Sequence, residues 1–213
     1  MLRRLLIISF ALLIAIAGLS YETLSAEQKK TEQKQKDKKS EETYKLKLSD
    51  PFLAKTMTYY LNIRSALVKG DNRGARVNAE QFVKAAKSTI SDSDKEKSAK
   101  EKDKVATQTN IMKAAMPIAD SQTGMTEARA VFGTLGDMIV DYISRIAPQS
   151  DSKQLKVYYC DISKHYWVET TDEKMANPFL GRDNPDCGEI KPGAPEPTAP
   201  GKDPFLKCEP KKK

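Results

Sequence analysis

Three cysteines and one histidine are the side chains of this sequence best suited to bind a metal or to form a covalent link. The cysteines are Cys160, Cys187 and Cys208, and the only histidine among the 213 residues is His165. A single histidine excludes a multi-histidine metal site within the chain, and a Ser-His-Asp catalytic site could use only that imidazole. Three cysteines allow at most one internal disulfide and leave one thiol over.

Cys160 and Cys187 admit two interpretations. The first is a disulfide that pins an irregular segment, stabilising the fold by roughly 3–4 kcal/mol through the entropy of the unfolded chain. The second is a thiolate pair that binds Cu(I) or another soft metal in the reduced state, with His165 as a third ligand. In either case Cys208 is expected to stay free or to form an intermolecular bridge.

A turn signal and an aromatic side chain accompany the cysteines. An Asn-Pro pair followed by a glycine predicts a turn that brings the second cysteine back towards the first. The single tryptophan is expected to anchor this segment to the rest of the domain, although its ring could instead bind a cation. The structural residues of this Cys/Trp hook are Trp167, Asn177, Pro178, Gly181 and Gly188.

Four amphipathic segments precede the hook and must position it. Their apolar residues recur at intervals of three and four, which predicts helices over about residues 50–70, 71–91, 95–119 and 126–148. Pro117 is expected to kink or end the third helix, and Pro148 to end the fourth. Short connections predict an all-α fold, an antiparallel four-helix bundle followed by an irregular hook. The β-prone run Leu155–Cys160 is too short to build a sheet alone.

The two ends of the chain have a different character. Arg3 and Arg4 followed by the apolar run Leu5–Leu19 predict a signal peptide over 1–26, cleaved after Ala26. Cleavage after Ala17 and an uncleaved membrane anchor are the alternatives. We expect a charged flexible linker over 27–48, the bundle and hook over 49–190, and a disordered Pro/Lys-rich tail over 191–213. The mature chain is therefore expected to be periplasmic or secreted.

Several stretches together resemble a known family. They are Tyr59–Val68 followed by Ala75 and Ala79, Ile111–Asp120, Glu127–Phe132, Tyr159-Cys160 with Trp167, Asn177–Gly181 and Cys187–Glu189. These stretches resemble the periplasmic helical domain of unknown function attached to some CusB/HlyD-type heavy-metal (copper) efflux adaptors, which also occurs as small exported proteins. The resemblance covers about residues 52–190.

The resemblance implies an exported, non-enzymatic accessory protein of heavy-metal handling or efflux in the cell envelope. Its partners would be envelope efflux components or another exported protein. The chain departs from the family pattern at Ile162 and Asn184, where the family usually carries methionine. Both changes remove a soft thioether ligand, so we expect weak or no metal binding by the oxidised protein. The alternative is therefore a structural or protein-interaction module of the periplasm or cell surface that has lost metal binding.

Motifs and composition argue against other functions. The sequence contains no Gly-rich phosphate loop, no nucleophile elbow and no HExxH motif, so we do not expect an enzyme. The net charge of +7 comes from 36 basic and 29 acidic residues, without the aromatic interleaving that stacks bases. A mean hydropathy of −0.59 argues against several membrane spans. We therefore expect no nucleic-acid partner, and contact with a membrane only through an uncleaved N-terminus.

Overall fold

The computed structural model describes residues 44–91 and 98–191. The expected signal peptide, most of the expected linker, the tail after Lys191 and Cys208 lie outside the described residues. Within the described ranges, no helix is both long enough and apolar enough to span a bilayer.

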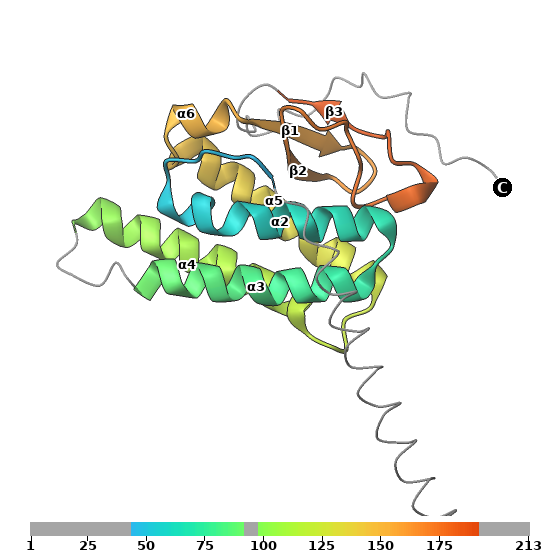
Figure 1. Ribbon diagram of the computed structural model, residues 1–213, viewed down its shortest axis with the longest axis horizontal. Helices are drawn as coiled ribbons and strands as arrows, with labels where there is room; N and C mark the ends of the chain where they lie inside the picture. Colours follow the sequence, from blue (N-terminus) through green and yellow to red (C-terminus); the bar gives the residue numbers. More distant parts are fainter. Residues whose placement is uncertain (1–43, 92–97, 192–213) are drawn as a thin grey trace, which may run out of the picture. The chain divides into compact units, whose positions relative to one another are not determined.

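Four long helices make up most of the described chain. They are α2 (Pro51–Lys69), α3 (Asn72–Ser91), α4 (Ala99–Ala119) and α5 (Met125–Arg145). Each helix packs against the next one along the chain, and α5 also contacts α2. The chain direction alternates from helix to helix (Figure 1). The four helical segments that the sequence predicts are thus present, and α4 continues through Pro117 to Ala119.

The ends of α2 show why the helix forms where the sequence predicts it. Oδ1 of Asp50 accepts hydrogen bonds from the backbone N–H groups of Phe52 and Leu53, both at 3.0 Å. Pro51 lies in the first turn, where its missing N–H would have no helical partner. Gly70 ends the helix with a φ of 71°, a left-handed conformation that glycine adopts without steric cost.

A small antiparallel sheet follows the short helix α6 (Gln149–Ser152). Its strands are β1 (Leu155–Cys160), β2 (His165–Thr170) and β3 (Glu189–Ile190), in the order β2-β1-β3. In the β1–β2 hairpin Val157 pairs with Val168, and Cys160 pairs with His165. The prediction of an all-α fold with an irregular hook is therefore wrong, because residues 155–190 contain three strands and the 3-10 turn η1 (Gly181–Asp183).

The hairpin forms because side chains of the helices accept hydrogen bonds from the outer edge of β2. The backbone N–H of Tyr166 donates to Oδ1 of Asp137 on α5 at 2.8 Å. The backbone N–H of Val168 donates to the hydroxyl of Tyr60 on α2 at 3.2 Å. These long-range contacts pair N–H groups at the edge of β2 that would otherwise have no partner in the protein. The β-propensity of the local sequence does not predict such contacts. The sheet lies against α5 and α2 (Figure 1).

The helices and the sheet share one hydrophobic core. Tyr60 of α2 stacks on Phe132 of α5 with ring centroids 5.0 Å apart. Phe132 also contacts Phe179 from the loop before η1, at 6.2 Å. The large, fully buried side chains include Trp167, Tyr60, Tyr142, Phe52, Phe82 and Phe132. Helical and sheet residues therefore depend on each other for burial.

The last residues of the expected linker lie against this core. Tyr44, Leu46 and Leu48 pack on it, whereas Lys45 and Lys47 point to solvent. The side chain of Gln154 holds this segment by bonding both backbone groups of Lys47. Its Oε1 accepts the N–H at 2.9 Å, and its Nε2 donates to the carbonyl at 2.7 Å. The packed domain therefore begins at or before Tyr44.

Candidate functional site

His165 lies at the first position of β2 and is bonded to α5. Its Nδ1 is 2.7 Å from Oδ2 of Asp137. The same carboxylate accepts the backbone N–H of Tyr166 through its other oxygen. Because a carboxylate only accepts hydrogen bonds, Nδ1 carries the hydrogen of this pair, and Nε2 is the nitrogen left for a ligand.

Two glycines of α5 allow the strand to approach the helix this closely. A Cβ atom at Gly133 would lie 2.4 Å from Cδ2 of His165. A Cβ atom at Gly136 would lie 2.2 Å from the carbonyl oxygen of Tyr166. Both distances are far below van der Waals contact, so any larger residue would push β2 away from α5.

A pocket of about 270 Å³ opens beside His165. Three parts of the chain meet there: the first turns of α5, the turn between β1 and β2, and the loop before η1. The lining residues are Thr126, Arg129, Ala130, Ser163, His165 and Phe179. None of these lining residues is acidic, so the wall offers hydrogen-bond donors and one permanent positive charge.

Two polar atoms of the lining residues lack a hydrogen-bond partner. Arg129 uses Nη2 to donate to the carbonyl of Leu67 at 3.0 Å, which fixes its guanidinium against the end of α2. Its Nε is buried and has no partner, and the same holds for Oγ of Ser163. Buried polar atoms are normally paired, so these two unpaired atoms are an exception, and both belong to residues that line the pocket.

Asp137, His165 and Ser163 have the residue types of a hydrolytic triad, but they do not form one. Since Oγ of Ser163 has no hydrogen-bond partner, it makes no bond to the imidazole that would have to take its proton. The arrangement is therefore better suited to binding a group than to cleaving it.

The predicted turn around Asn177 positions one wall of the pocket. Its Oδ1 accepts the backbone N–H groups of Phe179 at 2.8 Å and Leu180 at 3.1 Å. Its Nδ2 donates to the carbonyl of Cys187, which ties the loop to the segment before β3. Asn177 is fully buried, so these bonds are shielded from water. The turn therefore fixes Phe179 at the pocket.

Pro178 and Gly181 complete this turn. Pro178 is buried and lies between Asn177 and Phe179 in the sequence. Gly181 has a φ of 60°, and a Cβ atom there would lie 2.2 Å from Nη2 of Arg129. A glycine is thus needed both for the left-handed backbone and for the space that the guanidinium occupies.

Trp167 is buried between the sheet and the loop that follows it. The ring is fully buried, stacks on Tyr158 at 5.2 Å and meets the edge of Phe179 at 5.8 Å. Its Nε1 donates to Oε1 of Glu169 at 2.9 Å. A Cβ atom at Gly188 would lie 2.4 Å from Cη2 of this ring, so Gly188 is small because the tryptophan covers it.

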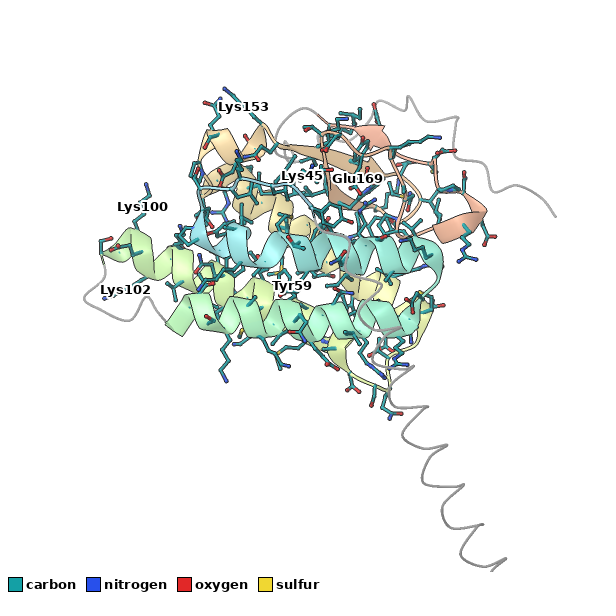
Figure 2. The ribbon with its side chains drawn as sticks, in the orientation of Figure 1. Lys45, Tyr59, Lys100, Lys102, Lys153 and Glu169 are labelled. Atoms are coloured by element: carbon teal, nitrogen blue, oxygen red, sulfur yellow. The ribbon has the colours of Figure 1, made fainter. Side chains whose placement is uncertain are left out.

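Glu169 is the centre of a buried charged cluster that the sequence analysis did not identify (Figure 2). Its Oε1 accepts hydrogen bonds from Nη1 of Arg64 at 2.7 Å and from the backbone N–H of Ala176 at 2.9 Å. Nη2 of Arg64 pairs with Glu173 at 2.8 Å. Burial opposes the charged form of Arg64, but the two glutamates more than offset it and raise the pKa of Arg64. The cluster joins α2 to β2 and the following loop.

The disulfide predicted between Cys160 and Cys187 is not formed. Cys160 is a free thiol with no exposed surface, and its Sγ accepts the backbone N–H of Ser163 at 3.4 Å. Its place at the end of β1, paired with His165 across the hairpin, keeps its sulfur in the core. Cys187 is disulfide-bonded, but not to Cys160.

The metal ligands expected from the sequence are not gathered in one place. Cys160 is buried in the core, Cys187 is engaged elsewhere, and His165 is bonded through Nδ1 to Asp137. Over the two described ranges, no three His, Cys, Asp or Glu side chains are grouped so that they could hold a metal ion. The pocket brings together His165 and the loop of Asn177, but neither cysteine lines it.

Three residues that complete the site were not predicted from the sequence. Asp137 lies outside the apolar stripe that contains Leu135 and Ile139, so its spacing in α5 gives no signal for a long-range contact. Arg129 lies in one of the stretches that carry the family resemblance. Ser163 gave no signal, because its place in the pocket depends on the hairpin.

Residues 56–151 match the model of a family described as a protein of unknown function (DUF3347). The matched region runs from within α2 to within α6. No curated protein and no solved structure matches the chain. Thr126, Arg129 and Ala130 lie inside the matched region, whereas Ser163 and His165 lie beyond it.

Proposed function

We propose that this protein is a non-enzymatic binding module of the cell envelope and that the pocket beside His165 is its recognition site. The observation that carries the proposal is the pocket itself. It has a volume of about 270 Å³ and is lined by both polar and apolar side chains, and Nε of Arg129 and Oγ of Ser163 lack partners. A concave site with a few convergent polar groups is the usual place for a ligand.

Of the two functions that the sequence suggests, the interaction module is the one we favour. Metal handling would require soft donors to converge, and neither Cys160 nor Cys187 lines the pocket. The pocket instead offers N–H and O–H groups, which bind oxygen-bearing ligands or a side chain of a partner. On the basis of the family resemblance, we further propose that the module works in the cell envelope beside efflux components.

A fragment screen by nuclear magnetic resonance tests this function. The full chain would be titrated with a mixed set of small neutral, cationic and anionic compounds. Binding at the pocket should shift the backbone amide signals of Thr126, Arg129 and Ala130. Ala130→Trp, which fills the pocket from an exposed position of α5, should abolish these shifts.

A matched variant on the same helix shows whether Ala130→Trp acts by filling the pocket or by disturbing the helix. Thr134 is exposed and does not line the pocket, so Thr134→Trp should leave the shifts intact. If no compound perturbs the pocket signals, or if Ala130→Trp leaves the binding unchanged, the pocket is not the recognition site.

A further inference from the structure

The pocket offers hydrogen-bond donors without a negative charge. Arg129 is a permanent cation, and Thr126 and Ser163 carry hydroxyl groups that can donate. The carboxylate bonded to His165, that of Asp137, is already occupied by Nδ1 and by a backbone N–H. A negatively charged group entering the pocket therefore meets donors rather than another carboxylate.

The guanidinium of Arg129 is held in place and has further N–H donors. Nη2 donates to the carbonyl of Leu67, and the group packs against Gly181. Nε has no partner. A guanidinium fixed in this way holds its N–H groups in one plane, and a carboxylate is the group that matches two parallel N–H donors.

The remaining wall of the pocket is apolar, which restricts the kind of ligand further. Phe179 and Ala130 are apolar, and the ring of Phe179 lies 5.9 Å from that of His165. The amide of Asn177 holds Phe179 in this position. The volume lies just below the roughly 300–1,000 Å³ of sites for drug-sized molecules, so the ligand must be small.

From these observations we propose that the pocket binds a carboxylate carried on a small apolar or aromatic group. Arg129 is the charge partner, the hydroxyls of Thr126 and Ser163 supply neutral donors, and Phe179 is the apolar wall. The inference rests on the proposed function, in which this pocket is the recognition site.

Calorimetric titration of the full chain with three probes tests the inference. Benzoate has both the carboxylate and the ring, benzamide has the ring without the charge, and inorganic phosphate has charge without a ring. Benzoate should bind saturably. Benzamide should bind about tenfold more weakly or worse, because it loses the charge-assisted bonds to Arg129. Phosphate should also bind more weakly than benzoate, because it has no surface for Phe179.

Variants test whether the charge of Arg129 causes the preference for benzoate over benzamide. Arg129→Gln should remove most of the preference for benzoate over benzamide. Arg129→Lys keeps the charge but loses the planar fork, and should reduce the preference less. Lys84→Gln removes the same charge from an exposed position of α3 and should leave the preference unchanged. The comparison of probes on the unmodified chain stands even if an Arg129 variant fails to fold.

The outcomes separate the inference from the proposed function. Equal binding of benzoate and benzamide, or tighter binding of phosphate than of benzoate, overturns the inference and leaves the pocket as the recognition site. Binding of other fragments at the pocket without any binding of benzoate does the same. If no compound binds in the pocket, in this titration or in the fragment screen, both the inference and the proposed function are wrong.

Discussion

Oε1 of Glu169 lies 2.7 Å from Nη1 of Arg64, and the two side chains are 0% and 5% exposed to solvent. The pair connects the sheet to α2 in a place that water does not reach. Oε1 also accepts the indole N–H of Trp167 and the backbone N–H of Ala176. One carboxylate oxygen thus organises the sheet, the tryptophan and the loop that leads to the pocket.

Removal of Glu169 should be strongly destabilising. Glu169→Ala leaves the guanidinium of Arg64 buried with its main counter-charge removed, which should lower the free energy of unfolding by about 3–5 kcal/mol. Chemical denaturation measures this change. The double variant Arg64→Met, Glu169→Leu should recover part of the loss, because no unpaired charge is then buried.

A surface pair provides the control for this prediction. Asp141 and Arg145 are 44% and 55% exposed, so Asp141→Ala should leave the denaturation curve nearly unchanged. Equal effects of Glu169→Ala and Asp141→Ala would contradict the role assigned to the buried cluster.

The close approach of β2 to α5 predicts that alanine is harmful at Gly136. In an ordinary helix, replacing glycine by alanine stabilises by about 0.5–1 kcal/mol. Here the new methyl group would meet the carbonyl oxygen of Tyr166 at 2.2 Å, and we expect a net loss of about 1–3 kcal/mol. Thermal unfolding measures the change. Thr134→Ala, on the exposed side of the same helix, should have little effect, and a stabilised Gly136→Ala protein would show that the strand does not lie where we place it.

Asp151 predicts a loss of stability in acid. Burial opposes the ionised form of this carboxylate, but hydrogen bonds from the backbone N–H groups of Ser49 and Asp50 outweigh it, and the pKa of Asp151 is lowered below its ordinary value. Because the pKa is lower in the folded state, the stabilisation is fully present above the unfolded pKa. It is lost as the pH falls through the folded pKa.

Denaturation at a series of pH values measures this contribution. Asp151→Asn should destabilise the protein at neutral pH and should make its stability less dependent on pH below about 4. An unchanged acid limb in the Asp151→Asn protein would mean that other carboxylates account for the acid sensitivity.

The cysteines predict a specific pattern of alkylation. Cys160 is fully buried and free, so it should resist alkylation in the folded protein and react when the chain is unfolded without a reductant. Peptide mapping by mass spectrometry identifies the labelled residue. Recovery of Cys160 in a peptide cross-linked to Cys187 would restore the disulfide first predicted from the sequence.

The helical part of the fold could be predicted from the sequence because its signals are local. Pro51 and Gly70 mark the two ends of α2, and the apolar spacing marks its buried face. The sheet could not be predicted in the same way. Its outer strand depends on Asp137 and Tyr60, which lie far away in the sequence and supply the hydrogen bonds that its edge needs.

The residues of the candidate site likewise fall into two groups, those with a local sequence signal and those that depend on long-range contacts. Asn177, Pro178 and Gly181 are visible as a turn because turn residues act on their own backbone. The role of His165 depends on Asp137 and on the space left by Gly133, and no spacing rule connects these residues. The cysteine pairing was predicted wrongly because the spacing of cysteines in the sequence says nothing about which sulfur faces the core.

The imidazole of His165 gives the most direct test of the pocket as a carboxylate site. Because the chain has a single histidine, an untagged protein with 15N-labelled histidine shows the ring signals of that residue alone. On saturation with benzoate, the Nε2 signal should shift, whereas Nδ1 should keep the signature of its bond to Asp137. An imidazole spectrum that does not change at saturating benzoate would contradict the account.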